Sequence, residues 1–428
     1  AAAWLLPAQF GKIEYAPLVD QVRGSGVAPK HLITVGADPL PGTVSFEALL
    51  REGTTGAGGH ELLEALRPDP REVCHLMPTG GTTGLPKLVP RTHNDYLCNA
   101  EFRARAWERS PQDTALVATP LTHNMALEVL LFPTLLTGGR LVILPSTDAE
   151  GILGAISQER VTTTILVPAQ LVDLVAVPEI ERYDRRTLGS LAGAGAKVPA
   201  ELVRKVRERF GVLFFNVFGM AEGPCAMTRP EDPPEVVEQT VGYPICPYDE
   251  FRILDDEGRP LPAGEEGELA ARGPGVFCGY YNDVAKNREV FTEEGFFRTG
   301  DLARLDGAGR LIIAGRKKDV LIRGGENISA AEVEELLMVH PDVAHAAVVG
   351  LPDPRLGERI CAYVQPVPGT RPTLEALRRF LGERGVSVLF HPERLELLEA
   401  LPLTNVGKVD KTALRADLEA RLRQEQQA

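Results

Sequence analysis

The pattern of apolar and polar positions along the chain predicts an α/β fold. Residues 114–119, 140–144 and 162–167 are short apolar runs of the strand type, and residues 91–108 have the spacing of a helix. Strands that alternate with helical segments predict a sheet covered by helices. Residues 1–70 show little periodicity beyond a possible strand at 31–35, and the stretch REGTTGAGGH predicts a loop.

The pattern changes after residue 250. Residues 250–272 and 302–313 contain short alternating runs separated by polar turns, which predicts a β-rich subdomain. We therefore expect an α/β protein whose large N-terminal domain, 1–317, combines α/β subdomains with this β-rich one. A small, mobile α+β C-terminal domain, 318–428, is expected to follow a boundary near Lys317 and Lys318. Its predicted elements are a helix at 329–340, strands at 344–349 and 359–364, a helix at 373–384 and a final helix from Asp410.

Composition narrows the class of protein. A chain of 428 residues is too long for one ordinary core, and its formal charge of −13 disfavours nucleic acid and anionic membranes as partners. The six cysteines are scattered without a C-x-x-C pair, which indicates reduced thiols in the cytoplasm rather than a zinc site or a disulfide framework. No apolar run approaches the roughly 20 residues that span a bilayer, and the opening AAAWLLPAQF lacks the charged start of a secretory signal.

The densest chemical signal is the segment MPTGGTTGLPKLVPRTH. Its glycines permit backbone N–H groups to approach an anion, while threonine hydroxyls and a lysine add donors and charge. The residues concerned are Thr79, Gly80, Gly81, Thr82, Thr83, Gly84 and Lys87. A polyphosphate loop and a flexible surface turn are both compatible with this composition. The segment is not a Walker loop, because Leu85 and Pro86 separate the last glycine from the lysine.

Several further motifs resemble one enzyme superfamily. The TGGTTG loop, FGMAEG, GYYN, RTGDLARLD, GRKKDVLIRGGENI and LPLTNVGKVDK occur in the order typical of acyl-adenylate-forming enzymes. The details THNDY, HNMA and GYPICPYDE look most like the aryl-acid AMP ligase branch, typified by 2,3-dihydroxybenzoate-AMP and salicylate-AMP ligases. The resemblance covers nearly the whole chain, although the family normally carries a further segment ahead of WLLPAQFGKIEY.

The resemblance implies an ATP site. The loop from Thr79 to Lys87 would hold the β and γ phosphates, and Glu222 would help hold Mg²⁺. Asp301 would accept the ribose hydroxyls, a geometry that suits a carboxylate. Taken alone, Glu222 and Asp301 would be an exposed loop acid and a turn-forming residue. The remaining implied nucleotide residues are Gly195 and Ala196 along adenine, Gly219 and Met220 as N–H donors, Ala221 where most of the superfamily has Thr, and Arg316 near ribose or phosphate.

The same resemblance implies a catalytic lysine and a domain rotation. Lys408 would bridge the substrate carboxylate and the α-phosphate, although a lone surface lysine is usually only solvated charge. Lys318 matches the hinge about which the C-terminal domain turns between half-reactions. Gly324, Gly325 and Glu326 would then line the tunnel for the acceptor thiol.

An acid pocket is implied around the HNMA motif. His123, Asn124 and Met125 occupy the motif where amino-acid-activating relatives carry an Asp for the substrate ammonium, which disfavours an α-amino acid. The neutral Asn124 amide can instead hydrogen-bond a phenol or aniline ortho to the carboxylate. His123 matches an aromatic gate, or a histidine that caps a strand end. Val129 replaces a Ser common in dihydroxybenzoate enzymes, which would leave a 3-hydroxyl unpaired at roughly 1–3 kcal/mol and favours salicylate. Met125, Gly193, Gly195 and Cys225 complete the slot, with core packing as the alternative role for Cys225.

The expected protein is therefore a Mg²⁺- and ATP-dependent ligase that makes an aryl-AMP. His123, Glu222 and Lys408 are its expected catalytic residues. The acceptor would be the phosphopantetheine thiol of an aryl carrier protein, or free coenzyme A, since both thiols share one arm. An inactive nucleotide-binding homologue remains the alternative of a different class.

Overall fold

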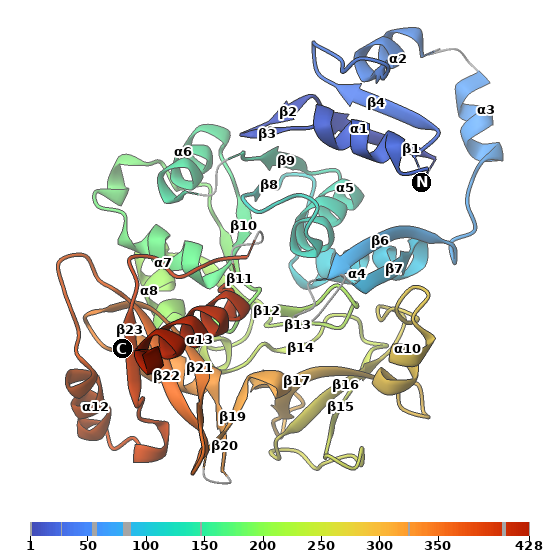
Figure 1. The fold of residues 1–428 in the computed structure, drawn as a ribbon. Coiled ribbons are helices and arrows are strands. Elements are labelled where there is room, and N and C mark those ends of the chain that lie inside the picture. Colours follow the sequence, from blue (N-terminus) through green and yellow to red (C-terminus); the bar gives the residue numbers. More distant parts are fainter. Residues whose placement is uncertain are drawn as a thin grey trace. The chain divides into compact units, whose positions relative to one another are not determined.

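The structure is a computed structural model that describes residues 2–26, 28–53, 58–79, 87–145, 148–323, 326–404 and 408–427 (Figure 1). The chain forms two compact units, Ala1–Asp69 and Pro70–Ala428. Sequence patterns did not predict this division. The predicted boundary near Lys317 and Lys318 lies inside the second unit and stays a prediction.

The first unit contains a parallel sheet with the strand order β1–β4–β5. Its strands are β1 (Ala3–Pro7), β4 (His31–Val35) and β5 (Val44–Ser45), with a small β2–β3 hairpin (Gln9–Phe10, Ile13–Glu14) and helices α1 (Ala16–Gly24), α2 (Phe46–Glu52) and α3 (Gly58–Ala65). The strand at 31–35 is confirmed. The loop predicted for 51–60 is wrong at both ends, because α2 continues to Glu52 and α3 begins at Gly58.

A seven-stranded sheet with the order β14–β13–β12–β11–β10–β8–β9 organises the second unit. Strands β8 to β12 run parallel, as the alternation of strands and helices predicted. The strands are β8 (Thr114–Val117), β9 (Arg140–Ile143), β10 (Thr163–Leu166), β11 (Ser190–Gly193), β12 (Leu213–Gly219), β13 (Cys225–Met227) and β14 (Tyr243–Pro244). The helical segments are α4 (His93–Ala106), η1 (Met125–Leu131), α5 (Phe132–Thr137), α6 (Ala149–Glu159), α7 (Pro168–Ala176), η2 (Ile180–Arg182), α8 (Ala200–Phe210) and α9 (Pro234–Gln239).

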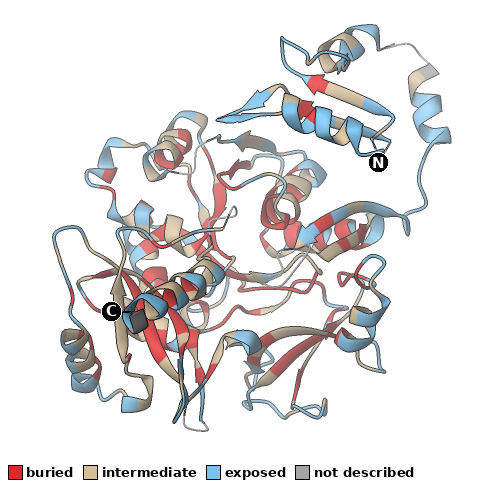
Figure 2. Ribbon diagram, viewed as in Figure 1, coloured by how far each residue is buried: buried red, intermediate tan, exposed pale blue. Residues whose placement is uncertain are grey.

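Both faces of this sheet are buried (Figure 2). Side chains alternate between the faces of a strand, so Leu116 joins a core cluster with α6, α7 and α8, while Ala115 and Val117 join another with η1. All four residues of β8 and of β10 are buried. Burial on both faces explains why these strands appear in the sequence as continuous apolar runs.

Two antiparallel elements adjoin the large sheet. The hairpin of β6 (Val73–Thr79) and β7 (Lys87–Thr92) precedes α4. A four-stranded sheet with the order β15–β16–β17–β18 forms the β-rich region predicted from the sequence. Its strands are Glu250–Leu254, Gly267–Arg272, Phe297–Leu305 and Leu311–Arg316, and α10 is Val284–Val290.

The C-terminal region is an α+β layer arrangement. Its strands are β19 (Val320–Arg323), β20 (Glu326–Ser329), β21 (Val343–Asp353), β22 (Gly357–Pro366) and β23 (Arg394–Leu397), and its helical segments are η3 (Lys317–Asp319), α11 (Ala330–Met338), α12 (Leu374–Glu383), η4 (Val388–Phe390) and α13 (Lys411–Gln427). Residues of β21 alternate between a cluster with α11 and α12 and a cluster with α13, so helices cover both faces. Figure 1 shows α13 lying across β21. The helices and strands predicted here are confirmed.

The helix predicted at 91–108 is shorter than expected because a cap fixes its start. The Asp95 backbone N–H donates to Thr92 Oγ1, and the Thr92 backbone N–H donates to Asp95 Oδ2. This reciprocal capping box begins α4 at His93 and leaves Arg91 in β7. None of the helices in the described part of the chain is long and apolar enough to cross a membrane.

Candidate functional site

The predicted phosphate loop connects the two strands of the β6–β7 hairpin. Thr79 and Lys87 are partners in the hairpin register, and Thr79 Oγ1 donates to the Lys87 carbonyl at 3.5 Å. Lys87 Nζ lies 4.9 Å from the centroid of the Tyr280 ring. Gly80, Gly81, Thr82, Thr83 and Gly84 lie outside the described residues. The hairpin therefore places the two ends of the loop beside each other.

Asp301 is a buried acceptor that pairs with the exposed Arg316 on the neighbouring strand. They are register partners of β17 and β18, and Arg316 Nε lies 2.6 Å from Asp301 Oδ1. Asp301 is only 3 % exposed, and its Oδ2 has no partner among the described residues. Burial raises the pKa of this carboxyl to about 6, opposed by the positive charges of Arg316 and Lys408. A buried oxygen without a donor fits the hydroxyl groups of a ribose.

Glu222 lies in a tight turn between β12 and β13. Tyr280 Oη donates to Glu222 Oε1 at 2.8 Å, and none of the described residues donates to Oε2. Gly223 has φ +109°, and a Cβ at this position would lie 2.0 Å from the Gly275 carbonyl oxygen. Only glycine permits this approach. The turn thus presents a carboxylate with one oxygen available, which fits the role of a Mg²⁺ ligand.

Lys408 reaches the same site from the C-terminal region. Its backbone is held by Thr404, whose N–H donates to the Lys408 carbonyl at 2.7 Å and whose Oγ1 accepts from the Lys408 N–H at 3.2 Å. The Lys408 side chain packs over Gly195. A Cβ built on Gly195 would lie 3.3 Å from Lys408 Cε. Burial, followed by the charge of Arg316, lowers the pKa of Lys408, while Asp301 and Glu222 oppose this shift. The structure therefore brings Lys408, Asp301, Glu222 and Gly195 together.

The two glycines of the AGAGAK segment have different roles. Gly195 has φ +88° and faces Lys408, and the adjacent Ala196 is exposed. A Cβ on Gly193 would instead lie 2.6 Å from Val198 and 2.8 Å from Phe214 in the core. Core packing thus requires glycine at 193. The expectation that Gly193 also helps to complete the acid slot stays a prediction.

The predicted acid-pocket residues are brought together by η1 and β13. Met125, Val129 and Cys225 are buried in one apolar cluster, and Gly219 pairs with Cys225 across β12 and β13. His123 precedes this cluster, and its Nδ1 accepts from the Met125 N–H at 3.2 Å. Burial, together with the positive charge of Lys408, lowers the pKa of His123 to about 4. His123 is therefore a neutral imidazole at physiological pH.

Asn124 makes more hydrogen bonds within the protein than the sequence suggested. Its Nδ2 donates to Glu128 Oε2 at 2.8 Å and to the Met220 carbonyl at 3.2 Å, and its Oδ1 accepts from Tyr96 Oη at 3.2 Å. The contact with a substrate phenol or aniline stays a prediction. Only Oδ1 retains capacity for it, since both N–H groups are used.

Sequence reasoning missed the residues that hold the Glu222 turn from behind. Arg91 is fully buried, and it donates to Asp95, to the Ala221 carbonyl at 2.9 Å and to the Gly275 carbonyl at 3.2 Å. Asn99 Nδ2 donates to the Gly223 carbonyl at 3.1 Å. Their sequence signal is weak, because an Arg in a strand or an Asn within a helix is usually an exposed residue.

The predicted hinge and thiol residues lie at the edge of the described region. Lys318 is in η3 beside Asp319, which pairs with Arg415 of α13 at 2.7 Å. Glu326 is exposed at the start of β20, where it pairs with Arg323 in the strand register. Gly324 and Gly325 lie outside the described residues. Rotation about Lys318 therefore stays a prediction.

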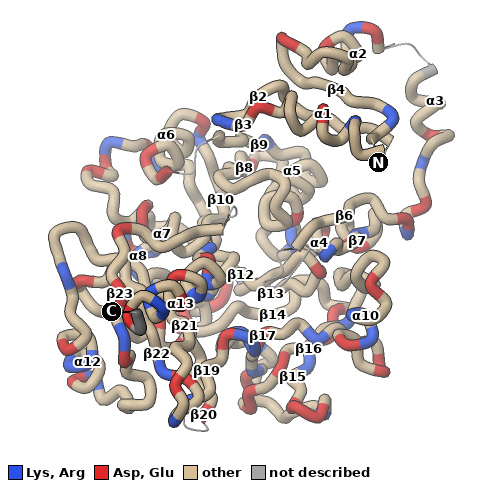
Figure 3. Tube along the Cα trace, in the orientation of Figure 1, with Lys and Arg blue, Asp and Glu red and all other residues tan. Residues whose placement is uncertain are grey.

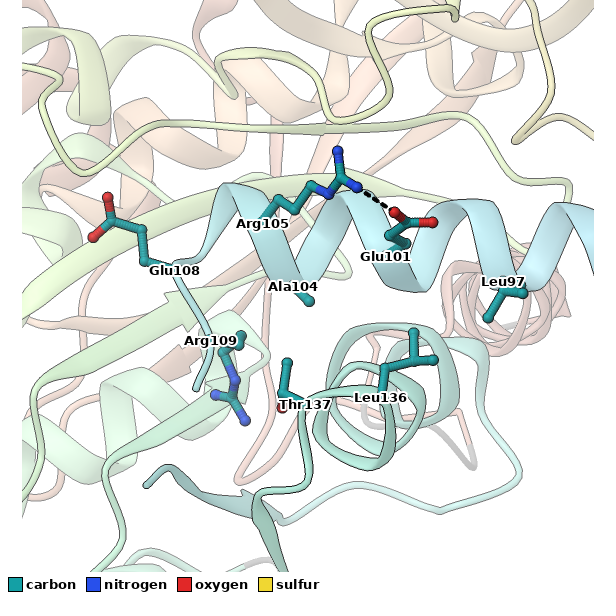
Figure 4. Close-up of a pocket in the computed structure, with 8 residues that line it drawn as sticks. All are labelled: Leu97, Glu101, Ala104, Arg105, Glu108, Arg109, Leu136 and Thr137. Carbon is teal, nitrogen blue, oxygen red and sulfur yellow. Dashed lines mark hydrogen bonds and ion pairs between the residues drawn. The ribbon is translucent and has the colours of Figure 1, made fainter. Parts of the chain in front are cut away.

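A separate groove lies between α4 and α5. Its volume is about 440 Å³, and its lining combines apolar and charged side chains (Figure 4): Leu97, Glu101, Ala104, Arg105, Glu108, Arg109, Leu136 and Thr137. None of the predicted site residues lines it.

Basic and acidic residues are interspersed along the described chain (Figure 3).

Comparison with known proteins identifies the class. The model of the AMP-binding enzyme family matches residues 13–281, and that of the AMP-binding enzyme C-terminal domain matches residues 332–408. The 2,3-dihydroxybenzoate-AMP ligase of Bacillus subtilis is 38 % identical over 423 residues, which cover 99 % of this chain and 76 % of that protein. The salicyl-AMP ligase / salicyl-S-ArCP synthetase of Mycobacterium tuberculosis is 40 % identical over 94 % of this chain and 70 % of that protein.

Solved structures agree with this class. The crystal structure of an anthranilate CoA ligase in complex with anthranoyl-AMP matches with a TM-score of 0.87 and 25 % identity, covering 99 % of this chain and 79 % of that one. The chain belongs to the family of AMP-binding enzymes, which use ATP with Mg²⁺. Within that family it falls in the branch of adenylate-forming aryl-acid AMP ligases. The resemblance and the α/β fold class inferred from the sequence are thereby confirmed.

Proposed function

We propose that this chain activates an aryl carboxylic acid, salicylate or a related ortho-substituted benzoate, as its aryl-AMP and then transfers the aryl group to a phosphopantetheine thiol. One observation carries the proposal. The Lys408 side chain lies over Gly195, and its charge acts on His123 of the acid pocket and on Asp301 of the predicted ribose site. A single cation thus stands between the predicted sites of the two reactants.

In the first half-reaction a carboxylate oxygen of the acid forms a bond to the α-phosphorus, and the bond from that phosphorus to pyrophosphate breaks. Both reactants are anions, so a cation between them lowers the repulsion and stabilises charge that develops in the transition state. Lys408 has this role. Asp301 orients the ribose, and Lys87 balances charge at the end of the phosphate loop. Mg²⁺, held by Glu222, would supply further charge neutralisation on the phosphates.

His123 would contact the acid without a charge of its own. A pKa of about 4 keeps its imidazole neutral at pH 7, so it does not compete with Lys408 for the substrate carboxylate. In the second half-reaction a thiolate forms a bond to the acyl carbon, and the bond from that carbon to AMP breaks.

The apolar side chain of Val129 supports a monohydroxylated or amino benzoate as the substrate. Val129 is buried and apolar, and it lies in the same cluster as Met125 and Cys225. A 3-hydroxyl placed against it would lose its hydrogen bond at roughly 1–3 kcal/mol. We therefore expect salicylate to be used better than 2,3-dihydroxybenzoate.

The acceptor is proposed to be an aryl carrier protein, and the chain is expected to act in the cytoplasm. The Mycobacterium tuberculosis relative is named as a salicyl-S-ArCP synthetase, which supports a carrier protein. Free coenzyme A is the second candidate, since one of the similar solved structures is that of an anthranilate CoA ligase.

Exchange of labelled pyrophosphate into ATP tests the first half-reaction. Salicylate, anthranilate, 2,3-dihydroxybenzoate and benzoate are supplied singly, and salicylate is expected to give the highest exchange. Exchange with none of these acids would refute the ligase proposal and favour an inactive nucleotide-binding protein. Parallel product assays with holo carrier protein and coenzyme A decide between the acceptors.

A further inference from the structure

Glu128 is a fully buried carboxylate among the predicted acid-pocket residues. It lies in η1, a π-helical segment whose neighbouring residues Met125 and Val129 belong to the pocket cluster. Its side chain is 0 % exposed. Burying a carboxylate costs free energy unless nearby donors and cations compensate its lost hydration. A buried charge at Glu128 therefore suggests a specific role for this residue.

Each oxygen of Glu128 accepts from a different residue of the predicted acid pocket. Oε2 accepts from Asn124 Nδ2 at 2.8 Å, and Oε1 accepts from the Cys225 thiol at 2.8 Å. Two buried guanidinium groups balance the charge, with Arg91 Nη1 and Arg103 Nη2 each 3.6 Å away. Burial and the Glu128 charge together raise the pKa of Cys225 well above its usual value, so this thiol stays protonated and remains a donor.

The carboxylate also determines which way the Asn124 amide points. With Nδ2 toward Glu128 and the Met220 carbonyl, the amide donates to two acceptors. The reversed orientation would place Oδ1 against a carboxylate and a carbonyl oxygen, with no hydrogen between them. Glu128 thus excludes the flipped amide. Oδ1, which already accepts from Tyr96 Oη, is then the only atom of Asn124 that can bind a ligand.

We propose that Glu128 is a positioning residue that fixes the Asn124 amide with its oxygen toward the ligand and so restricts the acid pocket to benzoates bearing an ortho hydrogen-bond donor. The inference rests on the proposed function and deepens it. A hydroxyl or amino substituent satisfies Oδ1, whereas a substituent that only accepts would face another acceptor. A site built for one hydrogen-bond polarity rejects the opposite one strongly.

Salicylate and 2-fluorobenzoate form a matched pair of substrates, since fluorine is small and cannot donate. In the exchange assay the wild type is expected to prefer salicylate in kcat/KM by roughly 10-fold or more, the range of one unpaired polar group. In Glu128→Gln the neutral amide can either donate or accept, so only the Met220 carbonyl still opposes a flipped Asn124 amide. The preference should fall to within about threefold, with a larger change in the KM for the acid than in that for ATP.

Tyr96→Phe is a second variant that retains the buried charge. It removes the O–H that donates to Asn124 Oδ1, so the ligand becomes the main donor and the preference for salicylate should rise. The matched control is Glu393→Gln, a similar change at a mostly buried carboxylate that accepts from Arg323 and from the Ile360 N–H, remote from the pocket. Glu393→Gln should lower the thermal stability but leave the preference for salicylate over 2-fluorobenzoate unchanged.

The outcomes separate this inference from the proposed function. No exchange by the wild type with any benzoate refutes the ligase itself. Exchange without discrimination between salicylate and 2-fluorobenzoate, or unchanged discrimination in a folded Glu128→Gln, overturns the role of Glu128 alone. If Glu128→Gln does not fold, a preference in Tyr96→Phe that stays level or falls overturns it.

Discussion

Replacing Asp301 with Asn changes the predicted ribose site at a single carboxylate. Asp301 Oδ1 is paired with Arg316, and Oδ2 is buried without a donor in the described structure. An amide of nearly the same shape keeps one acceptor but replaces the other by a donor. It also removes the charge that strengthens any hydrogen bond from the ribose.

The expected effect follows from the strength of such bonds. A hydrogen bond to a charged group contributes about 1.5–3 kcal/mol, and each 1.4 kcal/mol is tenfold in affinity. The KM for MgATP in pyrophosphate exchange should therefore rise roughly 10- to 150-fold. The KM for the aryl acid should change less than threefold, because Asp301 is predicted to contact only the nucleotide.

Folding should not suffer from this substitution. Burial raises the pKa of Asp301 to about 6, above its ordinary value, so its ionised form is unfavourable in the folded protein. A neutral Asn removes this penalty, and the Arg316 side chain left behind is 46 % exposed and can be hydrated. We expect the thermal midpoint of Asp301→Asn at pH 7 to equal or exceed that of the wild type.

Asp306→Asn is the matched control. Asp306 is on the turn between the same two strands and pairs with Arg310 at 2.7 Å, but it is not predicted to contact nucleotide. Its KM for MgATP should stay at the wild-type value. If the KM of Asp301→Asn remains within twofold of wild type while the protein is folded, Asp301 does not bind the ribose.

Three further predictions concern the same site. Lys408→Met should lower exchange by roughly 10²–10³-fold but leave transfer from synthetic salicyl-AMP to the thiol within threefold, and an equal loss in both steps would contradict a role confined to adenylation. Gly195→Ala should lower the exchange rate about tenfold, because φ +88° is strained for Ala by roughly 1–2 kcal/mol and its Cβ would lie 3.3 Å from Lys408 Cε; a wild-type rate would argue against this contact. The raised pKa of Asp301 contributes stability that is present below its unfolded pKa of 3.8 and is lost as pH rises through about 6, whereas nucleotide binding needs the ionised form. The affinity for MgATP should thus fall as the pH drops below about 6, measured by calorimetry, and this acid limb should vanish in Asp301→Asn; His123, with a pKa of about 4, should not produce it.

The sequence alone determined the class of protein and most of its elements. Strands β8 and β10 could be predicted because burial on both faces requires continuous apolar residues. Helices α12 and α13 could be predicted because helical periodicity is a local property of the sequence. The order of motifs implied the family, which the comparisons confirmed. In the first unit, by contrast, short strands and short helices leave too few residues for a periodic signal, so only β4 was found.

Only the tertiary structure decided how the motif residues meet. Lys408 and Gly195 are 213 positions apart in the sequence, and nothing local to either predicts that the Lys408 side chain packs over Gly195. The same holds for Arg91 against the Ala221 carbonyl and for Glu128 between Asn124 and Cys225. The hydrogen bonds from Arg91 to the Ala221 carbonyl and from Cys225 to Glu128 join segments far apart in the sequence. Their strength depends on burial, which only the folded structure provides. A sequence shows which groups are present, but their partners and their protonation are set by the packing around them.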